Sequence, residues 1–205
     1  MSETLPITRA QQQANTRQRL LEVAEATFLE KGYYGSSVAL VSRRAGFSTG
    51  ALYSNFASKE TLVLEVMDRH VAEQAQRLAV AVTTADSVRE VLTKVSAWFA
   101  DLLNDDPRWT ALEVEFTISA AGKPALARQL IHRQKLIREG LAEILRQQAD
   151  RFATSLALDA DTLAEAILSL GDGLAVRKLL DQGSDAVAVF HRSLALLLGS
   201  EPPEC

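Results

Sequence analysis

The chain has 205 residues, of which 47% are hydrophobic and 23% charged, and its formal net charge is −4. This composition is typical of a globular protein, either one large domain or a small domain joined to a medium one. No run approaches the roughly 18 apolar residues that a membrane span requires, and the N-terminus has no apolar signal core. A single cysteine, Cys205, excludes an internal disulfide or a thiolate metal cluster. We therefore expect a cytoplasmic protein with no membrane segment, metal or cofactor.

The charge is unevenly distributed along the chain. Residues 1–62 hold seven Lys and Arg against five acidic residues, whereas the remainder holds fifteen against twenty-one. This difference indicates that the first part, and not the whole surface, meets a polyanion.

The positions of proline and of the apolar residues predict helices only. Proline occurs at 6, 107, 124, 202 and 203, so the stretch 7–106 is free to be helical. Apolar residues recur at three- and four-residue spacing, and alternation over a strand length is absent. Capping residues such as Ser87 with Glu90, and prolines 107 and 124 at first helical positions, mark several helix starts. We predict an all-α fold of about nine helices, at 10–31, 38–45, 49–55, 59–82, 87–104, 107–121, 124–153, 159–182 and 184–198.

A helix-turn-helix is predicted between Gly32 and Lys59. Gly46 fits the tight turn between two short helices, Ser42 is a small residue for their crossing, and Leu52 is an apolar residue that seals the angle. The second helix then presents short polar side chains, which suit the major groove. Lys59 begins the next helix, where a phosphate can bind. From spacing alone, an αα-hairpin with a solvated polar face remains equally open.

The same segment resembles the TetR family of transcriptional regulators. The matching runs are Ala24–Tyr33, Ser37–Val38, Ala45–Ser48, Gly50–Tyr53, Asn55–Phe56 and Ser58–Leu62, within about residues 17–62. Gly171-Asp-Gly173-Leu174 before a leucine-rich last helix is similar to the dimerising end of many such regulators. The sequence departs from the family at Ser54-Asn55, where many members carry an aromatic residue or His before the Phe.

The resemblance implies a homodimeric repressor that binds a palindromic DNA operator and is released by a small-molecule ligand. An activator, or a regulator that needs no ligand, is the alternative within the family. The resemblance also implies an N-terminal DNA-binding domain at 1–62, a C-terminal effector-binding and dimerisation domain at 63–199, and a tail at 200–205.

The resemblance further implies particular DNA contacts. Contacts to phosphates or neighbouring bases are expected from Ser37, Ser48, Thr49, Tyr53 and Lys59. Gly50 and Ala51 are expected nearest the base edges, and Arg17 at the backbone or minor groove. The predicted DNA-binding set also includes Val38, Ser54 and Asn55.

One enzyme sequence pattern is present, but without the structural context that the chemistry needs. Residues 46–50 fit G-x-S-x-G, but the nucleophile elbow needs a preceding strand, and residues 38–45 have helical spacing. The three histidines (His70, His132 and His191) lack the spacing of metal ligands. We expect no enzyme; an α-helical enzyme or a scaffold is the alternative from another class.

An aromatic and apolar cluster follows the DNA-binding segment. As a group it is the candidate wall of an effector cavity, although each residue alone also fits a core position. The cluster consists of Trp98, Phe99, Leu102, Trp109 and Phe116. Glu113 with Glu115, or His132 with Arg128, can add polarity, so we predict an apolar or aromatic effector.

The last two predicted helices carry apolar stripes. Paired heads one DNA turn apart are needed because one helix-turn-helix contacts too few base pairs, which favours a homodimer. The candidate dimer residues are Leu163, Ile167, Leu170, Leu174, Leu194, Leu197 and Leu198. A monomeric core would use the same positions.

Overall fold

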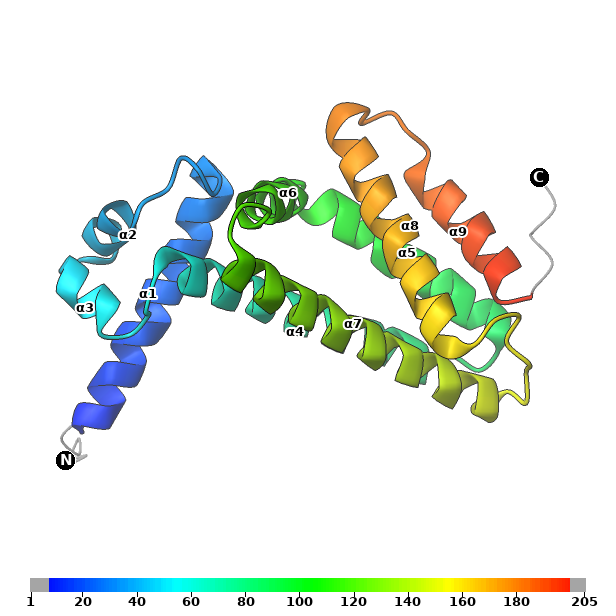
Figure 1. The fold of residues 1–205 in the computed structure, drawn as a ribbon. Helices are drawn as coiled ribbons and strands as arrows, with labels where there is room; N and C mark the ends of the chain where they lie inside the picture. Colours follow the sequence, from blue (N-terminus) through cyan, green and yellow to red (C-terminus); the bar gives the residue numbers. More distant parts are fainter. Residues whose placement is uncertain (1–7, 200–205) are drawn as a thin grey trace, which may run out of the picture. The chain divides into compact units, whose positions relative to one another are not determined.

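The computed structural model describes residues 8–199, and within them the chain forms nine α-helices and no strand (Figure 1). The all-α prediction is confirmed. The helices are α1 (Arg9–Lys31), α2 (Val38–Ala45), α3 (Thr49–Tyr53), α4 (Lys59–Thr83), α5 (Val88–Asp105), α6 (Arg108–Ala120), α7 (Pro124–Arg151), α8 (Ala160–Leu180) and α9 (Ala186–Leu197). The predicted tail at 200–205, with Cys205, and the N-terminal segment 1–7 lie outside the described residues.

Two compact units make up the chain. The first ends at Val71 and the second begins at Ala72, so the continuous helix α4 contributes to both. In the first unit, α1 buries Leu20, Ala24 and Phe28, which share one face because they are four residues apart. The core of this unit also holds buried residues further along the chain, namely Val41, Leu52, Phe56, Leu62, Val63 and Val66.

The second unit has its main core among α5, α8 and α9. Figure 1 shows α8 and α9 side by side and antiparallel, joined by a short connection. Phe99 of α5 stacks on Phe190 of α9, with ring centroids 4.0 Å apart and an interplanar angle of 21°. Smaller apolar clusters lie around Val82 and around Ala142. Among residues 8–199, no helix combines the length and the apolar character that crossing a membrane would take.

Candidate nucleic-acid interface

The turn between α2 and α3 has the geometry of a helix-turn-helix. Gly46 lies in the left-handed region at φ 78° and ψ 23°, a conformation that glycine adopts without strain. Its N–H donates to the carbonyl of Arg43 at 3.2 Å, and the N–H of Phe47 donates to the carbonyl of Ser42 at 2.9 Å. Ser42 and Leu52 are both buried, as the crossing of two short helices requires. These three residues play the steric parts that their spacing predicts.

Both helices begin at a serine whose hydroxyl caps the helix. Ser37 Oγ accepts from Leu40 N at 3.1 Å, and Ser48 Oγ accepts from Ala51 N at 3.1 Å. Both serines are exposed. A hydroxyl that accepts a hydrogen bond retains its O–H as a donor, so each cap can also contact a phosphate oxygen.

The exposed side of α3 is built from small residues and one aromatic residue. Thr49, Gly50 and Tyr53 are exposed, and 56% of Tyr53 is accessible to solvent. Ala51 of α3 and Val38 of α2 are half-buried. The start of α3 can therefore approach a polyanion closely, with few side chains of its own in the way.

Ser54 and Asn55 form hydrogen bonds within the end of α3. Ser54 Oγ and Asn55 Nδ2 each donate to the carbonyl of Ala51 at 2.8 Å. The Oδ1 atom of Asn55 is buried. The side-chain amide of Asn55 is therefore bonded to the end of α3, with its oxygen buried. The residue at which the sequence departs from the family pattern thus has a structural role.

Lys59 connects the start of α4 to the segment between α1 and α2. Its Nζ donates to the carbonyls of Tyr33 at 2.5 Å and of Ser36 at 2.7 Å, and lies 4.1 Å from the centroid of the Tyr33 ring. The ammonium thus fixes the loop that leads into Ser37. A phosphate contact by Lys59 remains a prediction beside this observed role.

Arg17 also has partners inside the first unit. It forms an ion pair with Glu65 of α4, and its guanidinium carbon lies 4.8 Å from the centroid of the Phe56 ring. The ion pair joins α1 to α4, so Arg17 supports the packing of the unit.

Sequence reasoning missed two arginines at the end of α2. Arg44 Nη1 donates to Glu30 Oε2 at 2.7 Å and to Thr27 Oγ1 at 3.4 Å, which fastens α2 to α1. The Arg44 guanidinium, and then Lys31, lower the pKa of Glu30 from 4.5 to about 2. Arg43, its neighbour, is exposed, and its side chain has no hydrogen bond or ion pair within residues 8–199. The sequence did contain a signal for Arg43, because residue 43 falls on the face of α2 opposite its buried residues.

In the second unit, the predicted effector residues divide between the core and the surface. Phe99 is 2% exposed and Phe116 is fully buried, while Trp98 and Leu102 pack beside the core of α5, α8 and α9. The Trp98 Nε1 atom is buried and has no hydrogen-bond partner among residues 8–199. His132 is exposed on α7 and Trp109 is half-buried on α6. The structure thus joins Trp98, Phe99 and Leu102 to one core, and Phe99 serves that core as a stacked ring.

A polar group lies among α6, α7 and α8. Glu113 Oε1 lies 3.8 Å from an Nη atom of Arg133, whose side chain is only 14% exposed. Burial raises the pKa of Glu113, although the positive charge of Arg133 opposes the shift. Burial also raises the pKa of Asp172 on α8, again against the effect of Arg133. Arg133, which sequence reasoning missed, is therefore the enclosed cation of this group.

Four of the predicted dimer residues lie in the protomer's own core. Leu163, Ile167, Leu174 and Leu194 are each no more than 8% exposed, so they have almost no area left for a partner. Their assignment to a dimer surface stays a prediction, and the apolar stripe that they form reports burial within the chain. Leu170, Leu197 and Leu198 are half-buried. The large apolar residues exposed on these helices are Val176, Leu180, Val189 and Leu196.

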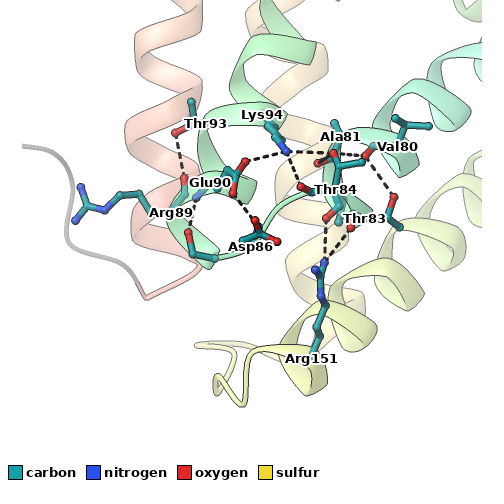
Figure 2. Close-up of polar contacts among 12 residues, drawn as sticks. Val80, Ala81, Thr83, Thr84, Asp86, Arg89, Glu90, Thr93, Lys94 and Arg151 are labelled. Atoms are coloured by element: carbon teal, nitrogen blue, oxygen red, sulfur yellow. Dashed lines mark hydrogen bonds and ion pairs between the residues drawn. The ribbon is translucent and has the colours of Figure 1, made fainter.

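Two cations hold the C-terminal end of α4 within the second unit. Lys94 Nζ of α5 donates to Thr84 O at 2.8 Å and to Thr84 Oγ1 at 3.1 Å (Figure 2). Arg151, at the end of α7, donates to the carbonyls of Val82 at 3.4 Å and Thr83 at 3.3 Å. Because the last carbonyls of a helix carry partial negative charge, both cations stabilise this helix end. The end of α4 is thereby tied to α5 and α7.

Comparison with known proteins identifies the family. Residues 20–66 match the family described as "Bacterial regulatory proteins, tetR family". Residues 88–199, more than half of the chain, match "BetI-type transcriptional repressor, C-terminal". The chain belongs to the TetR family. It is a DNA-binding transcriptional regulator, and proteins of this class are not enzymes.

Individual relatives of this TetR-family chain agree with the assignment. It is 26% identical over 147 residues to the HTH-type transcriptional repressor AcnR of Corynebacterium diphtheriae, and this alignment covers 71% of each chain. A putative transcriptional regulator from Rhodococcus sp. RHA1 has a similar fold, with a TM-score of 0.75 at 21% identity, covering 92% of this chain and 97% of that one. FadR from Bacillus subtilis, solved in complex with stearoyl-CoA, has a TM-score of 0.68 at 20% identity, covering 88% and 97%.

Proposed function

We propose that this TetR-family regulator is a homodimeric repressor that binds a palindromic operator and is released from it by a small apolar ligand. The observation that carries the proposal is the helix-turn-helix of α2 and α3, with its capped helix starts and exposed small residues. The match to a repressor C-terminal family and the similarity to the AcnR repressor support the sign of regulation. In this role the protein acts in the cytoplasm and performs no catalysis.

The proposed DNA contacts follow the exposure of each residue. The hydroxyls of Ser37, Ser48, Thr49 and Tyr53 contact phosphates or neighbouring bases, because all four side chains are exposed at the helix-turn-helix. Gly50 and half-buried Ala51 bring the α3 backbone close to the base edges.

The remaining predicted residues act in support of those contacts. Arg17 and Lys59 fix α1 and the loop before α2, and Ser54 and Asn55 hold the end of α3. We assign DNA binding to the N-terminal domain, and effector binding and dimerisation to the C-terminal domain.

The proposed dimer surface is the exposed face of α8 and α9. Val176 and Leu180 are one helical turn apart on α8, and Leu180 is 92% exposed. Gly173 is also exposed, and a Cβ placed on it would meet no atom of residues 8–199 within 4 Å. A glycine inside a helix costs about 1 kcal/mol relative to alanine, and no close contact with another described residue accounts for the glycine here. Close approach by a partner helix explains both the glycine and the exposed apolar side chains.

The proposed effector site lies among α5, α6 and α7 of the second unit. We assign Trp98, Leu102 and Trp109 to its apolar wall and Arg133 with Glu113 to its polar part, because the Arg133 side chain is only 14% exposed and an Nη atom lies 3.8 Å from Glu113 Oε1. FadR of Bacillus subtilis was solved with stearoyl-CoA, a ligand with a long apolar chain. That precedent in the same fold supports an apolar effector for this chain.

Helix α4 provides the physical connection between effector and DNA. It is one continuous helix from Lys59 to Thr83, and Lys94 and Arg151 hold its end against α5 and α7. An effector that favours a different arrangement of α5 and α7 therefore acts on the helix that carries the head. The effector shifts the population only as far as its affinities for the two arrangements differ.

The proposal is tested by binding of the purified protein to its selected operator, followed by fluorescence anisotropy. We expect two protomers per operator, with an affinity that falls steeply as salt rises because phosphate contacts release counterions. Titration with acyl thioesters and aromatic compounds should then release the DNA, with quenching or enhancement of tryptophan fluorescence. A monomer on the DNA, or an affinity independent of salt, contradicts the proposal.

A further inference from the structure

The recognition helix α3 has few side chains that can distinguish one base from another. Its exposed residues before Tyr53 are Thr49 and Gly50, preceded by the capping Ser48. A hydroxyl contacts several bases, whereas strong discrimination comes from two parallel hydrogen bonds by Arg, Asn or Gln. The amide of Asn55 donates to Ala51 O and its Oδ1 is buried. A sequence-specific head therefore needs a forked side chain from outside α3.

Arg43 lies next to α3 at the end of α2. Its carbonyl accepts the N–H of Gly46, so the residue belongs to the last turn of α2, directly before the turn into α3. Its side chain is exposed and has no hydrogen bond or ion pair within the part of the chain that the structure describes. All the donors of its guanidinium are therefore available to a ligand.

The direction of the Arg43 side chain follows from its neighbours on α2. Arg44 turns to α1, where it meets Glu30, and Val41 and Ser42 are buried. Since successive helical residues point about 100° apart, Arg43 leaves the helix on neither of those sides. Ala39, one turn earlier, is exposed on the same side and has only a methyl group. The guanidinium is therefore unobstructed along this face.

The position of Arg43 at the end of α2 favours contact with a base over contact with a phosphate. In a helix-turn-helix the first helix crosses the DNA backbone, and the N-terminal residues of the second contact base edges. The C-terminal end of α2 adjoins that N-terminus through Gly46, whereas Ser37 stands at the opposite end of α2. The C-terminus of a helix also carries partial negative charge, which disfavours a phosphate beside it.

Building on the proposed DNA-binding function, we propose that Arg43 determines operator specificity by reading one guanine in each half-site. Its guanidinium donates to O6 and N7 of the guanine in the major groove. Arg43 then supplies the base discrimination that the short side chains of α3 do not, and α3 sets the depth at which the head lies in the groove.

The test compares binding-site selection from random duplex DNA for the wild type, Arg43→Ala, Arg43→Lys and Arg44→Ala. Arg44→Ala is the control for charge because it removes the same charge from the neighbouring residue, and thermal melting measures the effect of the Glu30 contact that it also removes. We expect Arg43→Ala to lose the guanine preference at one symmetric pair of positions, where discrimination falls about 10- to 100-fold. Arg43→Lys should lose the same preference while keeping more affinity, because an ammonium retains the charge but lacks the planar fork. Arg44→Ala should keep the wild-type base preferences.

Four outcomes overturn the inference. Wild-type base preferences in both Arg43 variants would show that Arg43 reads no base. A uniform loss of affinity with a salt slope shallower by about 1 would make Arg43 a phosphate contact. A guanine preference lost equally in Arg44→Ala would make the effect one of charge. If the wild type itself enriches no sequence, the proposed DNA-binding role fails first. Circular dichroism and thermal melting identify a folding defect. We expect none in the Arg43 variants, because the Arg43 side chain is exposed and has no hydrogen bond or ion pair with the described residues.

Discussion

Replacing Phe99 by alanine distinguishes a core residue from the wall of a ligand cavity. Phe99 is 2% exposed, and its ring is stacked on Phe190 with 4.0 Å between centroids. Removing a buried phenylalanine ring typically costs about 3–5 kcal/mol, from lost burial and from the cavity that remains. The stacked partner would lose its contact as well, so we expect a loss in the upper half of that range. Because whole domains are stable by only about 5–15 kcal/mol, the effect would be large.

The assay is urea denaturation followed by tryptophan fluorescence. Both tryptophans, Trp98 and Trp109, belong to the second unit, so the signal reports the unit that contains Phe99. Protein concentration is kept equal between variants, because the proposed dimerisation would make apparent stability depend on it. Val80→Ala is the control, since Val80 is 58% exposed and its loss should change the free energy of unfolding by no more than about 0.5 kcal/mol. A loss below about 1 kcal/mol for Phe99→Ala would refute the core assignment.

Three further predictions concern the head and the partner surface. Lys59→Ala should destabilise the head by about 1–3 kcal/mol and speed hydrogen exchange in α2, because two backbone carbonyls lose a charged donor. Arg9→Ala, which removes an exposed cation at the start of α1, should leave exchange in α2 unchanged; equal exchange in the two variants contradicts this role of Lys59. The pKa of Glu30 is lowered to about 2 in the folded chain by Arg44 and then Lys31, so its stabilising effect is present above pH 4.5 and is lost as the pH falls toward 2. In Arg44→Ala, the carboxyl titration followed by NMR should move up toward the ordinary value, and an unchanged midpoint would show that Arg44 is not the cause. Leu180→Asp should convert the dimer to monomers in light scattering, since Leu180 is 92% exposed on the proposed dimer face; a variant that stays dimeric excludes that face.

The helix-turn-helix could be predicted from the sequence because its constraints are local and steric. Gly46 must adopt a left-handed conformation, Ser42 must be small, and Leu52 must be apolar, and all three requirements appear as residue types at fixed spacing. The serine caps are local signals of the same kind, because a capping hydroxyl reaches an amide only three residues away.

The partners of the charged and apolar residues could not be predicted in the same way. Arg43 and Arg44 are neighbours of one type, yet only Arg44 meets Glu30, fourteen residues earlier. Leu163 and Leu194 have the periodicity of a buried stripe, and periodicity does not say whether the burying surface is the same chain or a second copy. Such assignments depend on how the helices pack, which residue spacing along one helix does not contain.

Selection of binding sites from a random duplex pool with the purified protein tests the central claim most directly. A dimer with two helix-turn-helix heads should enrich an inverted repeat whose half-sites lie about one DNA turn apart. Enrichment of a single half-site, or of no sequence at moderate salt, would contradict the account of this chain as a dimeric, sequence-specific regulator.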